Sequence, residues 1–183
     1  MKALMIFADG FEDVEAIATR DVLVRGRVEV VDATINSEDK VVTSHKMNLV
    51  NFAKLKDINI KEFDALILPG GSRGVNNLLA SDLVINTLKE AKKNDLLICA
   101  ICAAPMVLAK VGLLKEQPFT CYPGCEEGLD GLYTGEEVVI LDKMITARSM
   151  LYSIPFGLAI LEKLKGLETR KRVYDQIAGY VKK

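Results

Sequence analysis

Cys102 stands where a cysteine can act as a nucleophile. The unbroken apolar run 96–101 is typical of a short strand buried on both faces, and a helical segment follows it at 103–111. A sharp turn from strand to helix exposes the residue at its tip among backbone N–H groups, the geometry of a nucleophile elbow. The positive end of the following helix favours the thiolate. The sequence therefore favours a reactive Cys102 over a buried structural thiol.

Two glycines and a small residue could supply the electrostatic partner of such a nucleophile. Gly70 and Gly71 follow the buried strand 65–68, and a glycine-rich turn at that place lets N–H groups point into a site. Together with the N–H of Ala103, which follows the cysteine, these donors would form an oxyanion hole.

Glu15 is the carboxyl that we expect beside the thiol. It lies in the first turn of the helix predicted at 11–24, and we expect it to lean toward the buried side of that helix. A carboxyl held near a thiolate should have a raised pKa and donate a hydrogen bond to the sulfur. Glu12 and Asp13 are interpreted as solvated first-turn acids. The apolar face of this helix is predicted to comprise Val14, Ile17, Ala18 and Leu23.

The other cysteines allow two further readings, which the pattern disfavours. Cys99 and Cys102 form a C-x-x-C, but three residues along a strand point side chains to opposite faces, which disfavours a disulfide. Cys121 and Cys125 could complete a four-cysteine zinc site by spacing. A core strand is a poor zinc knuckle, so we expect no metal.

His45 and Arg148 keep two interpretations each. His45, the single histidine, is either the imidazole of a Cys-His pair or a solvated loop residue. Arg148 either binds an anionic substrate group or anchors a loop.

The composition indicates an ordinary globular chain. Its 183 residues suit one domain, 1–183, and the net charge of −1 gives no reason to expect nucleic acid or an anionic membrane as partner. No apolar run approaches the ~18 residues of a membrane span, and we read the first apolar run as a strand and not as a signal peptide. Four cysteines without a secretory signal suggest a reducing cytoplasm.

Strands and helices alternate along the chain, which predicts a doubly wound α/β sandwich with a mostly parallel sheet and helices on both faces. The carboxyl ends of the strands should then bring together 9–15, 70–74 and 102–103. Strands are predicted at 3–7, 28–31, 65–68 and 96–101, edge strands within 40–51, a short strand at 116–121, and a hairpin at 138–146. Helices are predicted at 11–24, 81–93, 103–111, from 152 or 155 to 165, and at 169–181.

Three motifs in order resemble the ThiJ/PfpI family, in the branch of the Parkinsonism-associated deglycase and its bacterial relatives. They are Ala8-Asp9-Gly10-Phe11-Glu12-Asp13-Val14-Glu15, Leu68-Pro69-Gly70-Gly71 and Ile101-Cys102-Ala103-Ala104-Pro105. The resemblance implies a flavodoxin-like, class I glutamine-amidotransferase-like fold and a homodimer. It implies Cys102 as an oxidation-sensitive nucleophile, Glu15 as its hydrogen-bonding carboxyl, and oxyanion N–H groups from Gly71 and Ala103. By position, the resemblance implies that Arg148 helps to form an anion site near the cysteine. It also implies that His45 stands where relatives have a residue that reaches over from the other subunit.

Tyr122 departs from the family pattern. Many relatives carry a histidine near the cysteine, whereas this chain has Thr120-Cys121-Tyr122-Pro123. This argues against a cysteine peptidase or amidohydrolase. The expected activity is cofactor-free detoxification of reactive carbonyls, small dicarbonyls or glycated amines, through a hemithioacetal on Cys102. The alternative that the same residues allow is an oxidative-stress sensor or chaperone in which Cys102 becomes a sulfinic acid.

Overall fold

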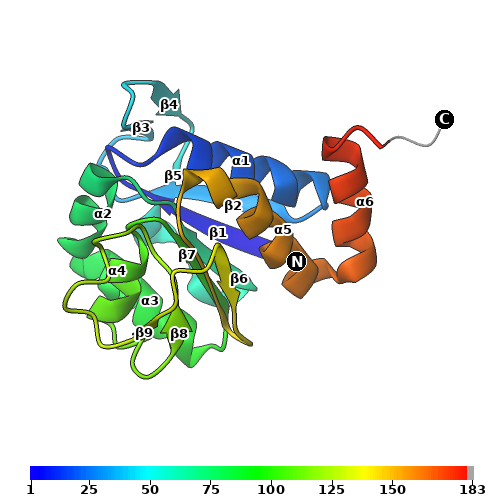
Figure 1. The fold of residues 1–183 in the computed structure, drawn as a ribbon. Coiled ribbons are helices and arrows are strands. Elements are labelled where there is room, and N and C mark those ends of the chain that lie inside the picture. Colours follow the sequence, from blue (N-terminus) through cyan, green and yellow to red (C-terminus); the bar gives the residue numbers. More distant parts are fainter. Residues whose placement is uncertain (181–183) are drawn as a thin grey trace.

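The computed structural model describes residues 1–180, and within them a seven-stranded sheet forms the centre of the molecule (Figure 1). All neighbouring strands pair in parallel except β10, which is antiparallel to β11. In spatial order the strands are β10 (Val138–Ile140), β11 (Met144–Ala147), β7 (Leu97–Ile101), β6 (Ala65–Leu68), β1 (Lys2–Phe7), β2 (Glu29–Thr34) and β5 (Ala53–Lys54).

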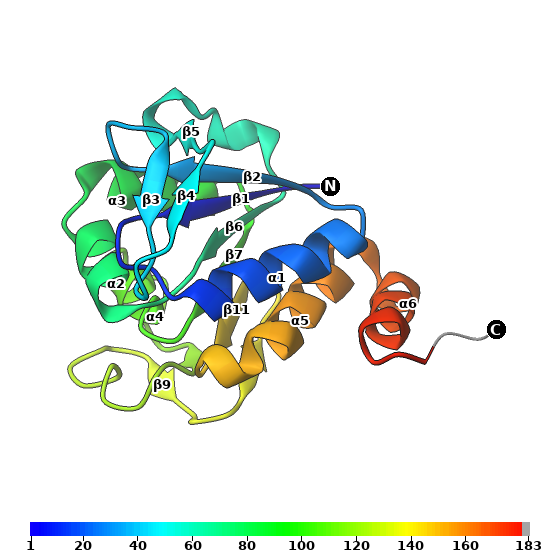
Figure 2. The same cartoon turned by 90° about the horizontal axis from the view of Figure 1, so that it is seen from above.

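Helices cover both faces of this sheet, which confirms the predicted three-layer arrangement. On one face α1 (Asp13–Arg25) and α5 (Ser153–Lys165) lie side by side, and α6 (Leu167–Ile177) packs on α5 (Figure 2). The other face carries α2 (Ser72–Leu79), α3 (Asp82–Lys93) and α4 (Pro105–Lys110). The central strand β1 alternates between the two layers: Leu4 and Ile6 belong to one core cluster, Met5 and Phe7 to the other.

Two small sheets stand outside the central one. β3 (Lys40–Val42) and β4 (Asn48–Val50) form an antiparallel hairpin, and β8 (Pro118–Phe119) pairs in parallel with β9 (Leu132–Tyr133). Short 3₁₀ turns occupy Leu55–Asp57, Ile60–Glu62 and Met150–Tyr152. The hairpin folds back over the start of α1, where the Gly10 N–H donates to Val42 (2.7 Å) and the Ser44 N–H to Phe11 (2.8 Å).

The buried face of α1 differs from the prediction. Of the predicted residues Leu23 is buried, whereas Val14 and Ile17 are 44% and 46% exposed; the other buried side chains of α1 are Glu15, Ala16, Thr19 and Val22. The reason is the close approach of α5: a Cβ on Gly157 would lie 3.0 Å from the Val22 Cβ and 3.3 Å from the Thr19 Cα. This close contact brings Thr19 and Val22, and not Val14 or Ile17, against α5.

Two helices also differ from the prediction. α2 was missed because its glycine interrupts the apolar pattern. Position 74 of this helix requires glycine, because a Cβ there would lie only 2.7 Å from the Phe11 N. The last helix begins at Leu167 and ends at Ile177, and Val181, its predicted end, lies outside the described residues. No helix in the described part of the chain is long and apolar enough to cross a membrane.

Candidate active site

The loops after β1, β6 and β7 meet at the carboxyl edge of the sheet, as parallel topology requires. The Glu12 N–H donates to the Gly70 carbonyl (3.0 Å), and the Gly74 N–H donates to the Gly10 carbonyl (3.1 Å). Gly71 has a φ of +91°, and a Cβ there would lie 2.5 Å from the Gly10 oxygen. Glycine is therefore required at position 71 both for its left-handed backbone and for its closeness to the first loop.

Cys102 occupies the left-handed region, with a φ of 63°. Few residues other than glycine adopt this conformation, which costs of order 1–3 kcal/mol and is typical of functional sites. Hydrogen bonds on both sides hold it: its N–H donates to the Ala147 carbonyl (2.9 Å), and its carbonyl accepts from the Tyr122 N–H (2.9 Å). The strand-to-helix turn thus has the geometry of a nucleophile elbow, with the partly exposed thiol at its tip.

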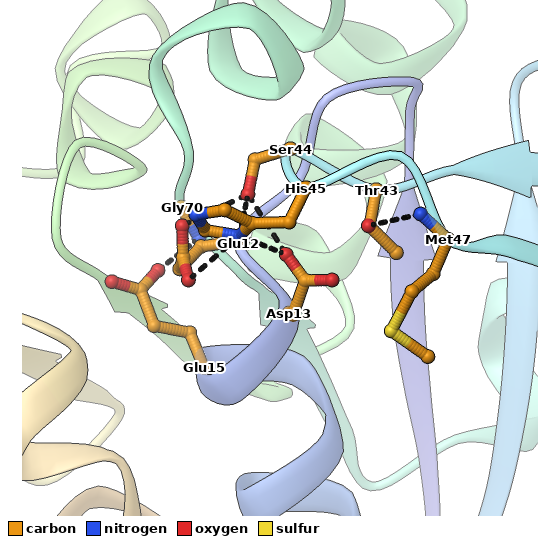
Figure 3. A network of polar contacts seen from close by, with 8 residues as sticks. All are labelled: Glu12, Asp13, Glu15, Thr43, Ser44, His45, Met47 and Gly70. Carbon is orange, nitrogen blue, oxygen red and sulfur yellow. Dashed lines mark hydrogen bonds and ion pairs between the residues drawn. The ribbon is translucent and has the colours of Figure 1, made fainter.

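Glu15 meets Cys102 across Gly70. The Glu15 side chain, 1% exposed, accepts a hydrogen bond from the Gly70 N–H (2.8 Å; Figure 3) and lies beside Cys102 at the wall of the same pocket. A Cβ on Gly70 would lie 2.5 Å from the Glu15 Oε2 and 2.7 Å from the Cys102 Cβ. Only glycine leaves room for the two functional groups to touch.

The electrostatics of this pair differ from the prediction in one respect. Burial raises the pKa of Glu15 to about 7, against the opposing hydrogen bonds of Cys102 and Gly70. Burial and the Glu15 charge also raise the pKa of the Cys102 thiol, and backbone hydrogen bonds from Gly71 and Ala103 offset this only in part. Burial and the neighbouring carboxyl thus oppose the thiolate that the sequence led us to expect at Cys102. The helix α4 begins three residues beyond the thiol, at Pro105, and is short.

Cys102 and Glu15 line a pocket of about 620 Å³. Its lining in the described part of the chain holds carboxyl and thiol groups but no histidine, lysine or arginine. Tyr122, half exposed, forms part of the wall. The remaining lining residues are Glu12, Gly71, Ser72, Val75, Asn76, Ala103, Met106, Pro123, Gly124, Cys125, Ser149 and Met150.

His45 lies at the tip of the β3–β4 hairpin and contacts the start of α1, not the pocket (Figure 3). Its Nδ1 is 2.7 Å from the Asp13 carboxylate and 3.9 Å from that of Glu12. The Ser44 hydroxyl lies 3.0 Å from the Glu12 and 2.8 Å from the Asp13 carboxylate. The hydrogen bond to Asp13 raises the pKa of His45. Although burial alone would raise the pKa of Asp13, hydrogen bonds from Thr43, His45 and Ser44 hold it below its usual value.

The acids Glu12 and Asp13 are thus not the solvated residues that the sequence suggested, because the hairpin covers them. With His45 they form the one group in the described chain whose ligand atoms lie close enough, within 4.8 Å, to hold a metal ion. Their arrangement is already accounted for by the His45–Asp13 ion pair and by the positive end of α1, which favours carboxylates and disfavours a cation.

Arg148 lies apart from the thiol and lines a different surface pocket. Its Nη1 donates to the Gly135 carbonyl (2.9 Å), and its guanidinium contacts the hydroxyl and the ring face of Tyr152. Of the two interpretations from the sequence, this geometry corresponds to the loop anchor.

The remaining cysteines are distributed over both layers of the core. Cys99 packs in the cluster on the α1/α5 side, whereas Cys121 packs in the opposite one. Cys125 reaches the pocket, a placement that the sequence reasoning missed because it weighed this residue only as a metal ligand. The four thiols are free.

The fold and site together define an α/β protein with a cysteine on a nucleophile elbow and a buried carboxyl as its partner. The DJ-1/PfpI family model matches residues 1–163, and the chain belongs to this family.

Named relatives agree with this assignment. The chain is 35% identical to Protein dj-1beta of Drosophila melanogaster over 93% of each protein. It is 36% identical to the glutathione-independent glyoxalase DJR-1.2 of Caenorhabditis elegans, over 86% of this chain and 84% of that protein. It is also 35% identical to Protein DJ-1 homolog B of Arabidopsis thaliana, of which it spans only 38%.

Solved structures agree on the fold. The crystal structure of Drosophila melanogaster DJ-1beta superposes with a TM-score of 0.89 at 33% identity, covering 97% of each chain. Oxidised Toxoplasma gondii DJ-1 gives a TM-score of 0.89 at 27% identity, again over 97% of each chain. The fold is therefore flavodoxin-like, as the family resemblance implied.

Proposed function

We propose that the protein is a cysteine-dependent glyoxalase or deglycase that converts methylglyoxal to lactate. The observation that carries the proposal is the placement of the Cys102 thiol and the buried Glu15 carboxyl on either side of Gly70, at the wall of one pocket. A nucleophile beside a base whose pKa is about 7 is matched to proton transfer at neutral pH. The glyoxalase name of the Caenorhabditis elegans relative supports the same reaction class.

In the proposed reaction, Glu15 acts as the base that Cys102 lacks. As the sulfur attacks the aldehyde carbon, the thiol proton passes to the Glu15 carboxylate. The resulting oxyanion is held by the N–H groups of Gly71 and Ala103. Protonation of this oxygen gives the hemithioacetal, and Glu15 then moves the proton from the former aldehyde carbon to the neighbouring carbon through an enediol. The product is a lactoyl thioester, which water hydrolyses to lactate and free Cys102. No net oxidant or reductant is consumed.

The absence of an imidazole from the described lining of the pocket weighs against the peptidase alternative. A peptidase must protonate an amine leaving group, the task that a histidine performs in a Cys-His pair. An aldehyde has no leaving group, so one carboxyl with a pKa near neutrality is sufficient.

The test is lactate formation from methylglyoxal by wild type, Cys102→Ser and Glu15→Gln. We expect at least a ~10²-fold loss of kcat in both variants, the usual contribution of a nucleophile or general base. Cys99→Ala is the matched control, since it removes a thiol in the core away from the pocket. Lactate formation at the wild-type rate by both pocket variants would disprove the proposal.

A redox role is the second candidate, because Cys102 is partly exposed and lies beside a carboxyl that can donate a hydrogen bond to an oxidised sulfur. Mass spectrometry after mild peroxide treatment tests it. Selective oxygen uptake on Cys102 is the expected result, and equal oxidation of the four cysteines would count against it.

We further propose a homodimer in a reducing compartment such as the cytoplasm. Exposed apolar side chains on α1, on the 3₁₀ turn Met150–Tyr152 and at the start of α5 support the dimer: Val14, Ile17, Met150, Leu151 and Ile154. The free thiols support the compartment. Sedimentation analysis of wild type and of Ile17→Glu tests the dimer; we expect the variant to be monomeric, and a monomeric wild type would refute it.

A further inference from the structure

The segment Cys121–Glu126 carries two thiols that the proposed reaction does not use, and hydrogen bonds join it to Cys102. The Tyr122 N–H donates to the Cys102 carbonyl (2.9 Å), and the Cys125 N–H donates to the Tyr122 carbonyl (2.9 Å). This chain of backbone contacts fixes the turn next to the elbow. Cys125, partly exposed, lines the same pocket as Cys102.

Cys125 is the accessible thiol of the pair, whereas Cys121 is buried behind it. The Cys121 sulfur lies 3.9 Å from the Glu126 carboxylate, which also accepts the Gly124 N–H (2.6 Å). These contacts tie Cys121 to the core side of the turn. At Gly124, which also lines the pocket, the backbone has a φ of +93° and a Cβ would meet nothing within 4 Å. The residue before Cys125 therefore leaves open space in the pocket, and the hydrogen bonds to Cys102 keep Cys125 beside that space.

Cys99 is not accessible from the pocket. It lies on the strand before the elbow and packs, fully buried, in the core cluster between the sheet and α1 and α5. Cys102, at the tip, faces the pocket instead. Cys125 is thus the other thiol in the described lining of the pocket.

We propose that Cys125 is the resolving thiol for oxidised Cys102, so that the pocket forms a reversible Cys102–Cys125 disulfide when it meets a hydroperoxide. In the first step the Cys102 sulfur attacks one peroxide oxygen and the O–O bond breaks. The thiol proton passes to the leaving oxygen, so that a sulfenic acid and an alcohol or water form. In the second step the Cys125 sulfur attacks the sulfenic sulfur. The S–O bond breaks, the S–S bond forms, and the Cys125 proton leaves with the oxygen as water. One peroxide is reduced by two electrons, which come from the two thiols.

The consequence is protection of the nucleophile. Sulfenic acid that is not resolved proceeds to sulfinic acid, which thiols do not reduce, whereas a disulfide is returned to two thiols by a low-molecular-weight thiol. The inference needs a reactive Cys102 but not the glyoxalase reaction itself.

Peptide mapping tests the proposal directly, because trypsin separates the two thiols. Cys102 falls in peptide 94–110 and Cys125 in peptide 116–143, which also holds Cys121. After treatment of a Cys99→Ala background with one equivalent of hydrogen peroxide, we expect the two peptides to be linked, two hydrogens lighter than their sum. In Cys125→Ser we expect Cys102 to reach sulfinic acid at a peroxide dose at least about tenfold lower than in the background protein. Cys121→Ser is the matched control and should keep the link.

Three outcomes would overturn the proposal. The first is a missing link with equal sulfinic acid formation in both proteins. The second is a disulfide confined to peptide 116–143 while Cys102 stays free. The third is a link that persists in Cys125→Ser.

As a functional readout, dithiothreitol should restore the methylglyoxal turnover of peroxide-treated protein only when Cys125 is present. Turnover absent from untreated protein would instead disprove the proposed activity and leave the peptide map to decide on the disulfide.

Discussion

Replacing Glu15 by glutamine should stabilise the protein above neutral pH while it abolishes turnover. The carboxyl is buried, and its pKa rises from 4.5 to about 7 on folding. The folded state therefore keeps a proton on Glu15 at pH values where the unfolded chain has already lost it. As the pH rises from 4.5 to 7, the unfolded state is progressively favoured, and above pH 7 the full cost of a buried charge remains.

A shift of this size corresponds to about 3 kcal/mol at pH 8, since one pKa unit is worth about 1.4 kcal/mol. The amide of Glu15→Gln carries no charge, and its oxygen still accepts the Gly70 N–H. The variant should thus gain up to about 3 kcal/mol over wild type at pH 8 and nothing below about pH 4.5.

Urea unfolding at fixed protein concentration in the presence of a reductant, from pH 4.5 to 8, measures this difference. An exposed glutamate provides the control: Glu127→Gln should stay within about 0.5 kcal/mol of wild type throughout. A Glu15→Gln variant that is no more stable than wild type at pH 8, or whose difference from wild type does not change with pH, would refute the reasoning.

Three further predictions concern the same geometry. Because Glu15 must be ionised to accept the thiol proton, kcat/KM for methylglyoxal should rise with pH through about 7 and fall below it; a flat profile from pH 5.5 to 8 contradicts that role. Gly70→Ala places a methyl group 2.5 Å from the Glu15 Oε2 and 2.7 Å from the Cys102 Cβ, so turnover should fall by at least ~10²-fold with secondary structure retained, as circular dichroism would show. Arg148→Ala removes the hydrogen bond to the Gly135 carbonyl and should lower the unfolding free energy by about 1–3 kcal/mol in urea titrations. KM for methylglyoxal should stay within about twofold, and a large rise in KM would reassign Arg148 to substrate binding.

The sequence was sufficient for the parts of the site that depend on local pattern and sheet topology. An apolar run that ends in Cys102 predicts the elbow, and parallel strands bring the Gly70–Gly71 turn to the same edge. The burial of Glu15 was predicted, but for a wrong reason. Val14 and Ile17 are exposed, and Glu15 is buried against the Gly70 turn and Cys102, while Thr19 and Val22 face α5. The close approach of α1 and α5 depends on Gly157, which lies far from α1 in the sequence, so the local periodicity of α1 could not predict it.

Long-range contacts account for what the sequence could not predict. The hairpin that carries His45 folds back on Asp13, so the single histidine joins an acidic cluster at the rim and not the thiol. Arg148 lies close to Cys102 in the sheet order, since β11 pairs with β7, yet its side chain turns away to Gly135 and Tyr152. The pairing of two strands determines where the Cα of a residue lies. The direction of a long side chain depends on its neighbours in the folded structure, which the local sequence pattern does not reveal.

The pKa values of Cys102 and Glu15 explain why a carboxyl can replace the missing imidazole. Both groups resist ionisation in the pocket, because burial opposes either charge and each charge opposes the other. The carboxyl is nevertheless the easier of the two to ionise, so above a pH of about 7 the negative charge resides on Glu15 and the proton on the sulfur. Attack by sulfur then transfers that proton a single hydrogen-bond length, and the charge moves onto an oxygen facing the N–H groups of Gly71 and Ala103. A lone thiolate would need stronger stabilisation than this short helix provides, whereas the pair needs only the contact that Gly70 permits.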